Sequence, residues 1–240
     1  MLFKRPQLNS TDIQKFADLI QQAHYIYAIT GAGISTNAGI PDLQHLAGRT
    51  SISLSSETSL ERDPQAFYRG FHDLFIDPIF TNGPTLAHQA LAKLEKVNKL
   101  SGIVTTNVDY LHELAGSQHV ADIWHSLNIN YCIKCGRTYD IQILKENVPI
   151  CLQCGGVISP GPVYHHIGID RAAYEKANHW MTSADLVIVI GSNGYYSNVN
   201  SSATVININK KENDFDQLAD LNIRGDADQV MDKTISIIGI

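Results

Sequence analysis

Short apolar runs alternate along this chain with segments whose apolar residues recur three or four positions apart. The runs lack the polar–apolar alternation of a half-exposed strand, and they lie at residues 24–29, 101–106, 120–126, 185–193 and 204–209. The segments between them have a helical period, as at Leu86, Ala90 and Leu94, which predicts amphipathic helices. Buried strands that alternate with helices are typical of a parallel sheet covered on both faces. The pattern therefore predicts an α/β fold.

A glycine-rich turn follows the first apolar run. Gly31 and Gly33 carry no Cβ, so the backbone can turn sharply there and a ligand can approach it closely. Ser35 is a favourable N-cap residue for a helix that starts directly after the turn. A strand, a glycine turn and a helix N-terminus together favour phosphate binding. The dinucleotide fingerprint is incomplete, because Thr36 stands in place of its third glycine, and a tight turn without a ligand remains the alternative.

Length and charge narrow the classes of protein that this chain can represent. With 240 residues it is long enough for a main domain plus a small one, and its net charge of −6 argues against general nucleic-acid binding. No apolar run approaches the ~20 residues of a membrane-spanning helix, and residues 1–6 lack the apolar core of a secretion signal. We therefore expect a cytoplasmic protein with no membrane partner and no specific nucleic-acid partner, and the oligomeric state stays open.

The four cysteines form the most specific local pattern. Cys132 and Cys135 make one C-x-x-C pair, and Cys151 and Cys154 make a second pair after fifteen intervening residues. Two such knuckles complete a tetrahedral zinc site of four thiolates, which leaves no position for a water molecule. The pattern predicts a structural zinc ribbon, with a redox pair or free buried thiols as the alternatives.

Polar residues follow several of the predicted strands, at the edge of the sheet where ligands bind in open α/β folds. Asn107 and Asp109 follow the second run, His125 lies at the end of the third, and Gly191 and Ser192 end the fourth. Turn chemistry alone can explain two polar residues after a strand, and a lone histidine there is commonly structural. The position of His125 just before the cysteine pattern favours a functional role.

These pieces occur in an order and with a spacing that resemble the sirtuin family of NAD-dependent protein deacylases. The resemblance covers roughly residues 12–230 and rests on Gly31-Ala32-Gly33-Ile34-Ser35 with Gly39-Ile40-Pro41-Asp42, Pro84-Thr85 with His88, Thr105 with Asn107-Val108-Asp109 and Leu111-His112, His125, the four cysteines, Gly155-Gly156, Gly191-Ser192, Asn207, and Gly225-Asp226-Ala227-Asp228. It implies a Rossmann-like parallel-sheet domain made of residues 1–126 and 166–240, with a small inserted zinc-ribbon lobe at residues 127–165.

The resemblance also implies roles for individual residues, with NAD and zinc as cofactors and a protein carrying an acylated lysine as substrate. His125 would be the general base, a task that suits a histidine near neutral pH, and Asn107 and Asp109 would line the nicotinamide pocket. The positions expected to contact NAD are Gly31, Ala32, Gly33, Ser35, Ile40, Asp42, Gln44, Thr106, Gly191, Ser192, Asn193, Asn207, Asp226 and Ala227.

Several side chains depart from the family pattern. Leu43 and Gln44 replace a phenylalanine and an arginine, Thr106 replaces a glutamine, and Ser126 replaces a glycine. The expected reaction is the removal of an acyl group from lysine with release of nicotinamide and O-acyl-ADP-ribose. Transfer of ADP-ribose to a protein, and an NAD-binding or assembly module with little turnover, remain the alternatives.

Overall fold

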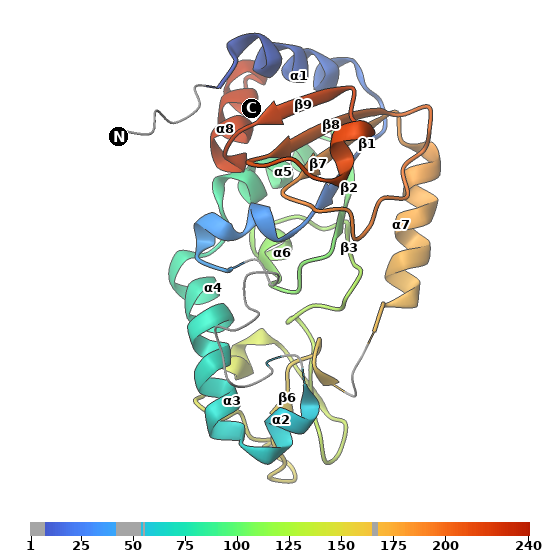
Figure 1. The fold of residues 1–240 in the computed structure, drawn as a ribbon. Helices are drawn as coiled ribbons and strands as arrows, with labels where there is room; N and C mark the ends of the chain where they lie inside the picture. The colour runs from blue at the N-terminus through green and yellow to red at the C-terminus, as the bar shows by residue number, and fades with distance from the viewer. Residues whose placement is uncertain (1–7, 42–53, 55, 165–167) are drawn as a thin grey trace, which may run out of the picture.

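The computed structural model describes residues 8–41, 54, 56–164 and 168–240, and its larger part is built around one parallel sheet (Figure 1). The six strands lie in the order β3-β2-β1-β7-β8-β9, and all neighbours are parallel. They are β1 Ile26–Thr30, β2 Leu100–Thr105, β3 Val120–Asp122, β7 Leu186–Ile190, β8 Thr204–Asn209 and β9 Leu221–Arg224. The predicted α/β sheet is confirmed. The apolar pattern missed β9, because Asn222 and Arg224 alternate there with apolar residues.

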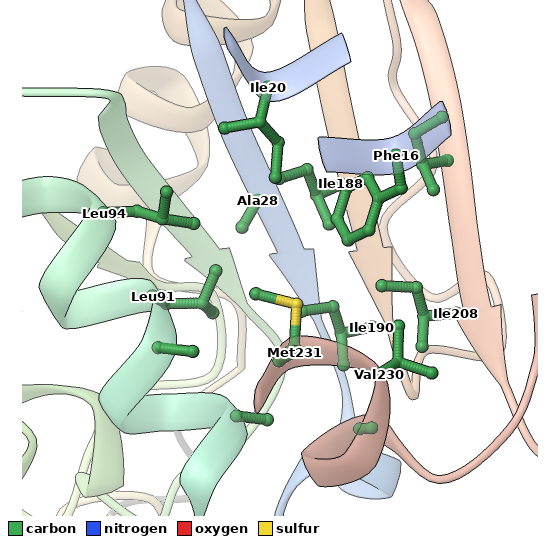
Figure 2. Packing of buried hydrophobic residues seen from close by; sticks show 14 of the residues in the cluster. Phe16, Ile20, Ala28, Leu91, Leu94, Ile188, Ile190, Ile208, Val230 and Met231 are labelled. Atoms are coloured by element: carbon green, nitrogen blue, oxygen red, sulfur yellow. The ribbon is translucent and has the colours of Figure 1, made fainter. Parts of the chain in front are cut away.

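Helices cover both faces of this sheet. On one face lie α1 Ser10–Gln22, α5 Leu86–Lys96 and α8 Ala227–Ile238, and on the other lies α7 Arg171–Ser183. Figure 2 shows Phe16, Leu91 and Met231, one from each helix of the first face, gathered against the strands. Every residue of β1 and of β7 is buried, which explains why these strands show no polar alternation. None of the described helices is both long and apolar enough to cross a membrane.

The chain between β3 and α7 forms a second, three-stranded antiparallel sheet in the order β5-β4-β6. Its elements are β4 Asn130–Cys132, β5 Thr138–Tyr139, a 3-10 turn at Ile141–Lys145, and β6 Ile158–Ser159. The cluster of buried residues around the two C-x-x-C pairs consists of Cys132, Cys151 and Ile158. So small a core needs a further source of stability.

A helical segment from the first half of the chain packs on this lobe (Figure 1). It comprises α2 Glu57–Arg62, α3 Pro64–Phe71, a π-helical turn at His72–Ile76, and α4 Asp77–Asn82. Phe67 and Phe71 share a core with Leu127 and Leu144 of the lobe. The helical segment continues past Pro78, because that proline falls in the first turn of α4. The domain limits stay a prediction, and the shared core is a reason to group α2–α4 with the lobe.

Candidate functional site

The glycine turn lies against the carboxyl end of β7. The Gly31 N–H donates to Ile190 O at 3.1 Å, and the Gly33 N–H donates to Gly191 O at 2.9 Å. A Cβ on Gly33 would lie 2.5 Å from Gly191 Cα, and a Cβ on Gly31 would lie 2.7 Å from Ser192 Cα. Gly191 itself has a φ of +59°, in the left-handed region that favours glycine. The two segments can therefore touch backbone to backbone only because these positions lack a Cβ.

The helix that the sequence predicted directly after the turn is absent. Two 3-10 turns, Ala32–Ile34 and Thr36–Ala38, take its place, and Gly39 follows with a φ of +88°. The left-handed Gly39 and the nearby Pro41 stop any longer helix. An anion at this turn would meet backbone N–H groups of short turns rather than the dipole of a long helix.

Four of the predicted residues form one buried network beside the turn. Asn107 Nδ2 donates to Gly31 O at 3.2 Å and to Ser35 Oγ at 3.1 Å, and the Ser35 hydroxyl donates to Asp109 Oδ2 at 2.6 Å. The Leu111 N–H donates to Asp109 Oδ1 at 3.0 Å. Burial raises the pKa of Asp109, and these two hydrogen bonds oppose that rise. The carboxyl ends of β1 and β2 thus bring together side chains that are far apart in the sequence.

A cavity of about 690 Å³ lies where the glycine turn meets the ends of β7 and β8. Four predicted NAD positions line it, namely Gly33, Gly191, Asn193 and Ala227. Asp226 caps α8 next to the cavity, where its carboxylate lies 2.7 Å from Lys210 Nζ and accepts from Asn37 Nδ2 at 3.0 Å. Lys210 also lines the cavity, and the sequence pattern did not single it out.

Asn207, a predicted NAD position, lies in an internal network of side chains and does not line the cavity. Its fully buried Nδ2 lies within hydrogen-bond distance of three side-chain oxygens, those of Asn213 at 3.1 Å, Asp216 at 2.8 Å and Asn222 at 3.0 Å, which share its two hydrogens. The amide is therefore committed to an internal network in the middle of β8. Asn209, at the carboxyl end of the same strand, lines the cavity in its place.

The buried hydroxyl of Ser192 is the best sign of a ligand at this edge. Ser192 is 1% exposed, and its Oγ has no hydrogen-bond partner among the described residues. A buried hydroxyl without a partner, beside a glycine cradle, fits a hydroxyl-rich ligand such as NAD.

Thr106, another predicted NAD position, donates its hydroxyl to Thr30 O at 3.3 Å. Two of the remaining predicted positions, half-buried Ala32 and buried Ile40, lie at the turn. The other two, Asp42 and Gln44, lie outside the described residues.

His125 lies in a turn after β3 rather than at the end of a strand. Strand β3 ends at Asp122, and His125 has a φ of +63°. Its Nδ1 lies 3.4 Å from Asp170 Oδ2, and its side chain is 27% exposed. The Asp170 N–H donates to Ile123 O at 2.8 Å, which holds the carboxylate beside the imidazole. His125 Nε2 has no hydrogen-bond partner in the described part of the chain, so it is the nitrogen available to take a proton.

The turn that carries His125 is tied to the network at the glycine turn. The Leu127 N–H donates to Val108 O at 2.9 Å, between the two predicted pocket residues Asn107 and Asp109. Asp170 is a candidate that sequence reasoning missed. Its only local signal is that it precedes the helical pattern of α7, where it caps the helix by accepting from the Ala173 N–H.

The four cysteines converge as predicted. Their Sγ atoms all lie within 4.8 Å of one another, with 3.4 Å between Cys132 and Cys154 and 3.7 Å between Cys135 and Cys151. Four Zn–S bonds of about 2.3 Å in a tetrahedron place sulfur atoms about 3.8 Å apart. The group therefore fits one zinc ion. A Cβ on Gly156 would lie 2.9 Å from Cys132 Sγ, so the glycine keeps that space open.

Comparison with known proteins gives one consistent result. The model of the Sir2 family matches residues 31–197. An NAD-dependent protein deacetylase of Clostridium perfringens is 33% identical over 93% of this chain and 98% of that protein, and one of Sulfurisphaera tokodaii is 36% identical over 89% and 90%. A solved complex of Sir2 with a p53 peptide and NAD+ has a TM-score of 0.79 and 30% identity, covering 95% of this chain and 98% of that one.

Proposed function

This chain belongs to the Sir2 family, and we propose that it is an NAD-dependent deacylase of protein lysines. The observation that carries the proposal is the buried network of Ser35, Asn107 and Asp109 at the glycine turn, with the His125–Asp170 pair tied beside it. When bound, NAD supplies an ADP-ribosyl group whose bond to nicotinamide can be broken. The products are the free lysine, nicotinamide and O-acyl-ADP-ribose.

Asn107 and Asp109 shape the nicotinamide side of this proposed site. The amide nitrogen of Asn107 is held by Gly31 O and Ser35 Oγ, which fixes the orientation of the side chain. Its Oδ1 has no hydrogen-bond partner among the residues that the structure describes. That oxygen can therefore accept a hydrogen bond from an amide N–H such as that of a carboxamide.

The cavity at the ends of β7 and β8 is where the rest of NAD would bind. The glycine turn would allow close approach of the pyrophosphate, and Lys211 and the Asp226-paired Lys210 line the same cavity. Ser192, Asn193 and Asn209 would meet the hydroxyl groups of the adenosine ribose. The four cysteines would hold zinc, which stabilises the small lobe and takes no part in the chemistry.

His125 acts as the general base in this proposal, and Asp170 orients it. A carboxylate at Nδ1 favours the proton on that nitrogen and leaves the Nε2 lone pair to accept another one. The base would take its proton from a ribose hydroxyl as the acyl group is transferred. It therefore contributes to the transition state more than to the binding of NAD.

The decisive experiment is mass spectrometry of the products formed from the protein, NAD and a panel of peptides with different acyl-lysines. Deacylated peptide together with O-acyl-ADP-ribose supports the proposal. ADP-ribosylated protein would show that the same site transfers ADP-ribose, and NAD binding without any product would show a binding module.

The His125→Ala variant tests the assigned base. We expect turnover to fall ~10²–10⁴-fold while NAD affinity, measured by calorimetry, is kept. His179→Ala, which changes an exposed histidine of α7, is the matched control and should leave both quantities unchanged. Equal turnover in the wild type and His125→Ala would make His125 a structural residue and would contradict the assignment.

A further inference from the structure

Two histidines and two threonines are buried together beneath the glycine turn, and the proposed reaction assigns them no role. Thr30 and His88 are 0% exposed, His112 is 1% exposed and Thr85 is 5% exposed. They come from four places in the chain, namely the end of β1, the N-terminus of α5 and its first turn, and the short helix α6 Leu111–Leu114. A cluster of polar side chains this deeply buried needs a physical reason.

The cluster holds both ends of the segment from residue 31 to residue 34. At one end, Thr30 Oγ1 and His112 Nε2 are hydrogen-bonded at 2.8 Å, directly before Gly31. At the other end, the Thr85 hydroxyl donates to Ile34 O at 3.2 Å. Thr85 is in turn held by His88, whose Nδ1 accepts from the Thr85 N–H at 3.3 Å in a capping box.

Each of the two imidazoles has one nitrogen in hydrogen-bond contact and one nitrogen without a partner in the described part of the chain. His88 Nδ1 lies 3.3 Å from the backbone nitrogen of Thr85 and 2.9 Å from its hydroxyl oxygen, so this ring makes its contacts through Nδ1 and not through Nε2. That Nε2 and the Nδ1 of His112 are buried and have no partner among the described residues. The rings lie 4.6 Å apart, centre to centre.

Both rings are neutral. Burial lowers the pKa of His112 to about 3. Burial, and to a smaller extent the neighbouring His112, holds the pKa of His88 well below its ordinary value. The pair therefore consists of two neutral rings, each with one donor and one acceptor nitrogen. It connects α5 and α6 beneath the turn that they support.

We infer that His88 and His112 are positioning residues that hold the glycine turn in register with the nicotinamide side of the site. The link is short, since Gly31 O accepts from Asn107, and Asp109 is capped by the N–H of Leu111, the neighbour of His112. Loss of either histidine contact lets the turn shift against Asn107 and Asp109. The inference rests on the proposed function, because it concerns affinity for NAD.

Amide substitutions test the inference with a crossed pattern. A glutamine amide mimics the Nε2 of histidine and an asparagine amide mimics the Nδ1. His112→Gln and His88→Asn thus keep the contacts to Thr30 and Thr85, whereas His112→Asn and His88→Gln lose them. The contact-losing variants should weaken NAD binding about 5- to 150-fold, as for a buried polar group left without its partner, with KM for the peptide unchanged. The contact-keeping pair should stay within about threefold of the wild type.

Calorimetric titration of the full chain with NAD, and thermal unfolding of each variant, give the readouts. Leu94→Ala, a core substitution on α5, controls for lost stability and should leave NAD affinity unchanged. Should a histidine variant not fold, Thr30→Val removes the hydroxyl while keeping the shape, and it should weaken NAD binding in the same way. If all four histidine variants behave like Leu94→Ala, the inference is overturned and the proposed function is not affected. A wild-type protein that does not bind NAD would overturn the proposed function.

Discussion

Replacing Gly33 by alanine should damage both the fold and the binding of NAD. The new Cβ would lie 2.5 Å from Gly191 Cα and 2.9 Å from Gly191 O, and both are backbone atoms that cannot rotate away. The turn and the end of β7 must then separate by about 0.9 Å, the difference between 2.5 Å and the 3.4 Å at which ordinary contact begins. A separation of that size also breaks the 2.9 Å hydrogen bond from the Gly33 N–H to Gly191 O.

The expected loss follows from these two effects. Overpacking costs about 1–3 kcal/mol and a lost hydrogen bond about 0.5–1.5 kcal/mol, which together give about 1.5–4.5 kcal/mol. For a chain of this size each kcal/mol lowers the Tm by about 2–4 °C, so Gly33→Ala should unfold about 3–18 °C earlier. NAD affinity should fall at least about tenfold, the equivalent of one hydrogen bond to a charged phosphate.

Thermal unfolding and calorimetric titration with NAD measure the two effects. Gly168→Ala is the matched control, because a Cβ at Gly168 meets nothing within 4 Å, and it should change neither quantity. If Gly33→Ala melts and binds NAD as the wild type does, the backbone contact with Gly191 is not what shapes the site, and the reasoning fails.

Three further predictions concern other parts of the molecule. Purified protein should contain one zinc per chain, and Cys132→Ser should unfold the small lobe, since structural zinc is worth on the order of 10 kcal/mol; unchanged proteolysis after chelation would contradict this. Asn209→Ala should weaken NAD binding, whereas Asn207→Ala should lower the Tm and leave the affinity of the folded protein for NAD unchanged; the reverse pattern would support the sequence-based assignment. Burial raises the pKa of Glu113 to about 8 and that of Asp122 to about 6. The folded protein therefore holds protons that the unfolded chain releases, so the free energy of unfolding should fall as the pH rises toward 8. Glu113→Gln should flatten that dependence in melts between about pH 5.5 and pH 8.5, and a parallel dependence in both proteins would refute the assignment.

The features that the sequence predicted correctly are those with a local pattern. The buried strands β1, β2, β7 and β8 are apolar runs, and an apolar run can be recognised without knowing its neighbours. The two C-x-x-C knuckles each place two thiolates within a four-residue turn, and the structure brings all four within reach of one zinc ion. The glycines of the turn are visible in the sequence, while the contact that requires them, with Gly191, is not.

The tertiary structure decided which distant segments are in contact and where each strand ends. Asp170 meets His125 only because α7 starts beside the turn after β3, and α2–α4 join the small lobe only because their apolar faces match it. Asn207 and Asn209 carry the same side chain two residues apart on one strand, so nothing local separates them. One lies in mid-strand under the Asn213–Asp216 segment and the other at the carboxyl end of the sheet. Periodicity reports which face of an element is buried, but where an element stops and what packs on it depend on the free energy of the whole fold.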